Sequence, residues 1–152
     1  MSRVRPRLRV LRECVDSPSD ALLASRMLAW GVLLPILKYV LPLPTLARLA
    51  WRGGRGRARN HEHEAKISTL ARLVATRSNC LERSLVAYRF LARASADPRL
   101  VVGLGRQEDR VRGHVWVTLD GNPLLESAET LREYTPIVSF GVRGAADVPS
   151  EL

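Results

Sequence analysis

The sequence predicts an α+β fold, in which helices come first and an antiparallel sheet follows. Apolar residues recur at helical spacing in several segments before residue 95. From Leu100 the pattern changes to strands, and His114-Val115-Trp116-Val117-Thr118-Leu119 alternates with a period of two. Asp120-Gly121 is typical of a tight turn between antiparallel strands. The chain has 152 residues and is 46% hydrophobic, which is enough to bury the core of such a fold.

The first helix is expected from about Ala21, capped by Ser19-Asp20 and ended by Pro35. The segment Leu41-Pro42-Leu43-Pro44 predicts an extended turn, and a short helix is expected over residues 45–51. The residues before about Leu11 alternate arginine with other types, which is typical of a solvated strand or a disordered arm.

Residues 52–57 consist only of arginine and glycine, which predicts a flexible basic linker. We therefore expect a basic N-terminal helical arm and linker over residues 1–60, and a second domain over residues 61–152. Residues 1–60 hold twelve Lys and Arg against three acids, and residues 61–152 hold twelve of each. The whole excess charge of +9 thus lies in the arm, which indicates an acidic partner such as nucleic acid, anionic lipid or a protein.

A further helix is expected up to about Ala75, and another begins at Cys80. Asn79 can cap this second helix, and Glu82 can reach back in the manner of a capping box. We expect strands over residues 100–104, 114–119, 124–126 and 137–140, with a polar loop over residues 105–113.

The helix start gives Cys80 the surroundings of a nucleophile. A cysteine attacks as a thiolate, and the N-terminus of a helix stabilises that negative charge. The N–H groups of the first turn can also face the oxyanion that forms after attack on a carbonyl. Cys14 has no such cap. The alternative is that Cys80 is a packed, small apolar side chain.

The general base would be His114, His61 or His63. His114 opens a core strand directly after a loop, so the sheet can hold its ring while it reaches a neighbouring helix. The other two histidines lie beside the linker, where nothing fixes them, and they are a weak signal for a metal site. The alternative for His114 is a half-buried strand residue without a catalytic role.

Glu126 and Asp120 are the candidates for orienting the imidazole of His114. Asp120 lies six residues further along the same strand, which at about 3.3 Å per residue places it roughly 20 Å away. Glu126 returns on the partner strand, where opposed residues are about 5 Å apart. A two-residue turn would point Glu126 to the wrong face, and a longer loop or a bulge would correct this. We therefore favour Glu126, on that condition.

The run Asn79-Cys80-Leu81-Glu82-Arg83-Ser84-Leu85, followed by His114-Val115-Trp116-Val117 and Asp120-Gly121, resembles the lasso-peptide leader peptidases. These form part of the transglutaminase-like group of papain-type cysteine proteases. The segment Leu41-Pro42-Leu43-Pro44 is also similar to that family, and the similarity covers about residues 20–135. Val115 stands where the family usually has Ala, which removes no reactive group.

The resemblance implies a transglutaminase-like core, in which the helix that bears the nucleophile packs on an antiparallel sheet. It implies that Cys80 attacks, that His114 moves the proton and that Glu126, in the family's acidic position, holds the imidazole. The implied reaction removes the leader from a ribosomal precursor and frees the amine that a separate cyclase uses. A separate leader-recognition protein is implied as a partner. No metal or cofactor is required.

Two alternative functions are a transglutaminase-like domain that binds a peptide without cleaving it, and a basic protein that docks on nucleic acid or membrane. Nucleic acid is disfavoured because the charge is balanced after Asn60 and because the arginine-rich residues before about Leu11 have no interleaved aromatic residues. Because prolines interrupt the apolar run, we expect residues 27–51 either to pack against the domain or to lie at a membrane surface, and not to span a membrane. Two cysteines in dissimilar settings do not indicate a disulfide framework, so we expect a cytoplasmic location.

Overall fold

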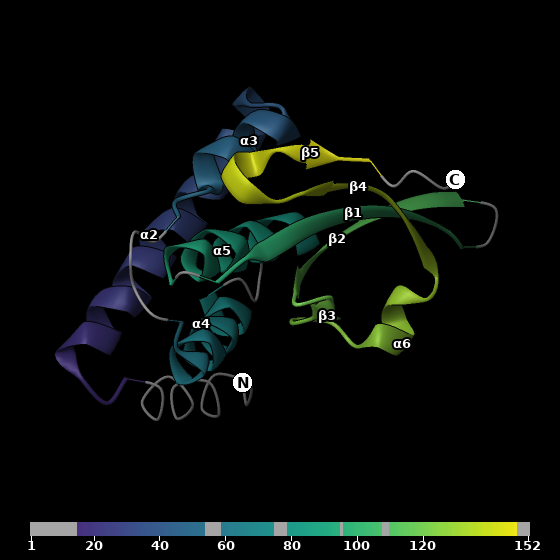
Figure 1. Ribbon diagram of the computed structural model, residues 1–152. Helices are drawn as coiled ribbons and strands as arrows, with labels where there is room; N and C mark the ends of the chain where they lie inside the picture. Colours follow the sequence, from purple (N-terminus) through teal and green to yellow (C-terminus); the bar gives the residue numbers. More distant parts are fainter. Residues whose placement is uncertain (1–14, 54–58, 75–78, 95, 108–109, 149–152) are drawn as a thin grey trace, which may run out of the picture.

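The computed structural model describes residues 15–53, 59–74, 79–94, 96–107 and 110–148. Cys14, the arginine-rich residues before about Leu11 and most of the expected linker lie outside these residues. Four longer helices come first and an antiparallel sheet follows, so the predicted α+β class is confirmed (Figure 1). The helices are α2 (Pro18–Val40), α3 (Leu43–Ala50), α4 (His61–Val74) and α5 (Cys80–Arg93).

Helix α2 begins earlier and ends later than its sequence predicts. Ser17 is the N-cap, and its side-chain oxygen accepts a hydrogen bond from the Asp20 N–H at 3.2 Å. The helix continues through Pro35, so the prediction that Pro35 ends it is wrong. A proline removes only one helical hydrogen bond, and here Leu34 and Leu37 continue the packed face on either side of it.

The sheet has the strand order β3-β2-β1-β4-β5, and every neighbouring pair is antiparallel. The strands are β1 (Pro98–Gln107), β2 (Arg110–Leu119), β3 (Asn122–Pro123), β4 (Tyr134–Phe140) and β5 (Ala146–Asp147). The sequence did not indicate β5, the short helix α6 (Ala128–Leu131) or the 3₁₀ turn η1 (Val142–Gly144). These elements are too short to show a periodic pattern.

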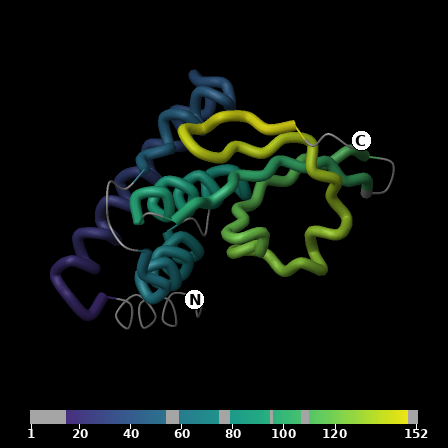
Figure 2. Tube along the Cα trace, viewed as in Figure 1, coloured from purple at the N-terminus to yellow at the C-terminus, as the bar shows by residue number. Residues whose placement is uncertain are grey.

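Two strand predictions are wrong. The polar loop expected over residues 105–113 is largely strand, because the β1–β2 ladder continues outward to the pair Gln107 and Arg110. Ladder hydrogen bonds need only the backbone, so polar side chains do not end them. The strand expected over residues 124–126 is absent, since β3 ends at Pro123 and the chain then bends away. Figure 2 shows β3 and α6 on the wide loop that joins β2 to β4.

Helix α5 is the centre of the core, and it contacts α2, α3, α4, β1 and β2. Val115, Val117 and Leu119, which alternate along β2 and so share one face of it, lie in this core. Residues of α2 and α3, such as Met27 and Leu46, belong to the same core. Helices from both sides of Asn60 therefore share one core, while the division of the chain into domains at Asn60 stays a prediction.

Candidate active site

Cys80 is the first residue of α5, as the sequence predicts. The Asn79 side chain accepts a hydrogen bond from the Glu82 N–H at 3.1 Å, and the Asn79 carbonyl accepts one from the Arg83 N–H at 3.3 Å. These two bonds satisfy the backbone N–H groups of Glu82 and Arg83 and stabilise the first turn of α5. Cys80 itself is half-buried, and its thiol is free.

The start of α5 is tied to α2 and to the sheet. The buried Glu82 carboxylate accepts a hydrogen bond from Lys38 of α2 at 2.6 Å, and this carboxylate raises the pKa of Lys38. Ser84, one turn after Cys80, donates to the Val115 carbonyl at 3.0 Å in the buried core. Because Val115 directly follows His114, this bond fixes the helix of the thiol beside the strand of the imidazole.

His114 is held between aromatic rings on the face of the sheet opposite to Val115. Its ring stacks on Tyr134 of β4, with centroids 4.8 Å apart, and lies 6.1 Å from the ring of Trp116. Its side chain is only 16% exposed. The sequence did not indicate Tyr134, because no local pattern tells which residue of a later strand will face a given ring.

Glycines in β1 make room for these rings. A Cβ at Gly103, which pairs with His114, would lie 2.7 Å from the Trp116 ring. A Cβ at Gly105 would lie 2.9 Å from the Tyr134 ring and 2.5 Å from the Glu133 carbonyl oxygen. The aromatic support of His114 therefore depends on two positions without side chains.

The structure brings Glu126 to His114, by a route other than the expected one. The turn is the two-residue Asp120-Gly121 type with positive φ at both positions, so the register alone would point Glu126 away. The pairing ends after the Leu124 N–H donates to the Val117 carbonyl at 3.1 Å, and the following bend redirects the chain. The Glu126 Oε1 atom then lies 3.6 Å from His114 Nε2.

Arg83 is a member of this site that sequence reasoning did not single out. Its guanidinium forms an ion pair with the same Oε1 atom of Glu126. Arg83 Nε and His114 Nε2 are both buried and make no hydrogen bond within the described part of the chain. The spacing in the sequence could have indicated Arg83, because it lies three residues after Cys80 and therefore at the same end of α5.

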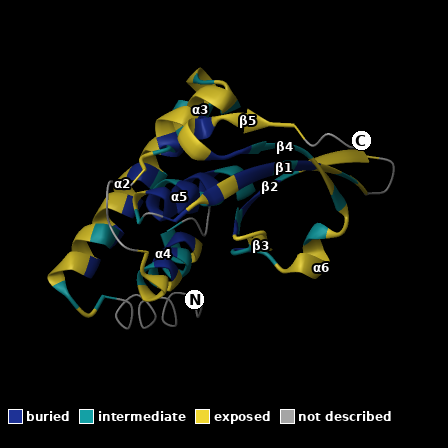
Figure 3. Cartoon of the chain, viewed as in Figure 1, coloured by how far each residue is buried: buried dark blue, intermediate teal, exposed yellow. Residues whose placement is uncertain are grey.

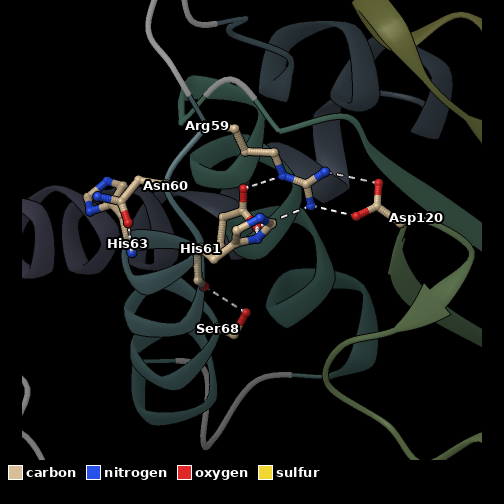
Figure 4. Close-up of polar contacts among 7 residues, drawn as sticks. Arg59, Asn60, His61, His63, Ser68 and Asp120 are labelled. Carbon is tan, nitrogen blue, oxygen red and sulfur yellow. Dashed lines mark hydrogen bonds and ion pairs between the residues drawn. The ribbon is translucent and has the colours of Figure 1, made fainter.

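Asp120 lies in a different cluster, which Figure 4 shows. The Arg59 guanidinium donates to both of its carboxylate oxygens, at 3.1 and 2.6 Å, and also to Glu64. This arginine lowers the pKa of Asp120 below its usual value. The ion pair of Asp120 with Arg59 thus connects the β2–β3 turn to the start of α4. Of the two candidates, Glu126 is the one that lies beside the imidazole of His114.

His61 and His63 lie on the first turn of α4, near Arg59 and Asn60 (Figure 4). His61 Nδ1 is 3.3 Å from Glu64, and the His63 N–H donates to the Asn60 side chain at 3.1 Å. Across the described ranges, no group of three or more His, Cys, Asp or Glu side chains is arranged to hold a metal ion.

The arrangement supplies the parts of a thiol-dependent acyl transfer. A half-buried thiol lies at a helix start, a held imidazole lies on the adjoining strand, and Nε2 of that imidazole faces a carboxylate. The ring nitrogen left to serve the thiol is therefore Nδ1. No hydrogen bond between Cys80 and His114 is present in the described residues, and such bonds are often long before substrate binds.

A family model described as the transglutaminase-like superfamily matches residues 24–139. The match contains Cys80, His114 and Glu126, and it begins within α2. The superfamily includes cysteine peptidases, and the match does not separate the lasso-peptide leader peptidases from its other members. No curated protein and no solved structure matches the chain.

Proposed function

The chain belongs to the transglutaminase-like superfamily, and from this premise we propose that it is a cysteine peptidase with Cys80 as nucleophile and His114 as general base. The observation that carries the proposal is the orientation of His114. Its Nε2 faces Glu126 at 3.6 Å, and the Ser84–Val115 bond fixes the Cys80 end of α5 beside the same strand. In this proposal Cys80 attacks the substrate, His114 transfers the proton and Glu126 orients the imidazole.

The reaction would proceed through a thioester. His114 Nδ1 accepts the thiol proton as Cys80 Sγ attacks the peptide carbonyl, and the imidazolium then protonates the leaving amine. A water molecule, deprotonated by the imidazole, hydrolyses the thioester and regenerates the thiol. Glu126 keeps the ring oriented throughout. The N–H groups of Cys80 and Leu81 are not engaged by the Asn79 cap, so they are the donors left for the oxyanion.

We propose the leader of a lasso-peptide precursor as the substrate, in the cytoplasm. The support is the motif around Cys80 together with the His-Val-Trp-Val run at residues 114–117. Cleavage would release the leader and free the α-amine of the core peptide for macrolactam formation by a separate cyclase. A separate recognition protein would deliver the precursor.

The test incubates the precursor peptide and the recognition protein with wild-type chain, Cys80→Ala or His114→Ala, and identifies products by mass spectrometry. We expect one cleavage by the wild type only, at the junction between leader and core. Asp120→Asn is the matched control, because it removes a carboxylate that lies outside the site, and it should cleave normally. Equal cleavage by Cys80→Ala would end the peptidase proposal. Binding of the precursor with no cleavage by any form would favour a peptide-binding role instead.

A further inference from the structure

Helix α2 carries a long apolar face that the described part of the chain leaves exposed. Exposed apolar side chains recur every three or four residues along it, including Tyr39 at 85% exposure, Val32 and Val40 at 73%, and Ile36 at 63%. Leu22, Leu28 and Leu33 continue the same face. Figure 3 shows this face along the outer side of the molecule. A contiguous apolar surface of this length is typical of an interaction site.

The opposite face of α2 is fixed to the domain. Met27 and Leu34 are fully buried, Asp20 bonds Lys66 of α4 at 3.1 Å, and Lys38 bonds Glu82 of α5. By length and composition the 23-residue helix could cross a membrane. Crossing would remove these side chains from the core and separate both ion pairs, so the folded domain can offer only the outer face of α2.

Arginines border the apolar face on the side toward α5. Two adjoining pockets between α2 and α5 share Arg26, Phe90 and Arg93, and Arg89 lines the second of them. No carboxylate pairs with these three arginines within the described residues. Burial, followed by the neighbouring charges of Arg52 and Arg93, lowers the pKa of Arg89 to about 10. Arg89 donates to the Leu49 carbonyl at 3.0 Å and lies 4.1 Å from the centroid of the Trp30 ring. Within the described residues, Arg26 and Arg93 are therefore the cations of this border that are left to meet an anionic partner.

We propose that α2 lies flat on an anionic lipid bilayer, with its outer face in the boundary between headgroups and acyl chains and the arginine border among the headgroups. Interfacial helices combine an apolar face with flanking cations in this way. A second copy of the chain is disfavoured, because a twofold contact through α2 would bring the two arginine borders together. The sequence before α2 adds five arginines against two acids. The proposal is independent of the peptidase activity.

The test measures flotation of the full chain with vesicles of phosphatidylcholine alone or mixed with phosphatidylglycerol, at low and high salt. We expect binding to the anionic vesicles that weakens with salt. Val32→Asp with Ile36→Asp should reduce the partition coefficient by more than about tenfold. Arg93→Gln should reduce it by about fivefold, the value expected for one cation near an anionic surface.

Val111→Asp with Val148→Asp is the matched control, because both valines are exposed, at 71% and 61%, and lie outside α2. This variant should bind like the wild type, and thermal melts should show that all variants fold. Absence of wild-type binding to anionic vesicles, or equal binding by the α2 variant, would overturn the proposal. A wild-type dimer that the α2 substitutions convert to monomers would overturn it in favour of a second copy.

Discussion

Gly103 offers a sharp test of how the sheet supports His114. Gly103 pairs with His114 across β1 and β2, and a Cβ placed on it would lie 2.7 and 2.8 Å from two atoms of the Trp116 ring. It would also lie 3.0 Å from the Thr135 carbonyl oxygen on the other neighbouring strand. Gly103→Ala therefore adds one methyl group to a space that is closed on two sides.

The expected cost follows from these distances. Carbon atoms in contact prefer about 3.5–4.0 Å, so the buried Trp116 ring must move by roughly 1 Å. Overpacking of this kind destabilises a fold by about 1–3 kcal/mol. For a domain of this size we expect the midpoint of thermal unfolding to fall by roughly 2–12 °C. Because Trp116 neighbours the His114 ring, we also expect the peptidase rate to fall by up to about 100-fold.

The assay compares Gly103→Ala with Gly113→Ala by thermal unfolding, tryptophan fluorescence and cleavage rate. Gly113 lies in β2, directly before His114, but a Cβ there would lie 3.9 Å from Leu104 Cδ2, an ordinary contact. We expect Gly113→Ala to unfold and cleave like the wild type. Equal unfolding midpoints and rates for the two variants would refute the steric reasoning.

Three other predictions concern single contacts. Glu126→Gln should lower kcat by about 10²–10⁴-fold while Asp120→Asn stays within about twofold, measured by steady-state kinetics; the reverse ranking would reject Glu126. Ser84→Ala should cost about 1–3 kcal/mol in urea unfolding, since it leaves the buried Val115 carbonyl without its donor, and an unchanged midpoint would contradict this. Arg59 lowers the pKa of Asp120 in the folded protein. The ion pair between them therefore stabilises the fold fully above the pKa of Asp120 in the unfolded chain, about 4, and this stabilisation is lost as the pH falls through the lower pKa of the folded state. Arg59→Gln should therefore show a smaller loss of thermal stability below about pH 4 than the wild type, and identical pH profiles would count against this pairing.

The local features of the fold were predictable because neighbouring residues create them. Asn79 caps the helix that begins at Cys80 through bonds within one turn, so the sequence places the thiol at a helix start. Alternation along β2 likewise separates the core face from the face of His114. The ends of α2 and of the β1–β2 hairpin were not predictable in this way, because packing carries α2 through Pro35 and the ladder continues through polar residues.

The composition of the site depends on contacts between segments that are distant in the sequence. The register of the Asp120-Gly121 turn points Glu126 away from His114, and only the bend after Leu124 reverses that direction. Arg83 enters the site through its ion pair with Glu126, and Tyr134 enters through the pairing of β4 with β1.

The sequence by itself therefore determined the α+β class and the start of the helix at Cys80, since capping and periodicity act over a few residues. It also determined that His114 and Val115 lie on opposite faces of one strand, because side chains alternate along a strand. Only the tertiary structure decided that Glu126 rather than Asp120 lies beside His114. The reason is physical: Asp120 is bound by Arg59, and the distance between two segments is set by the packing of the whole chain.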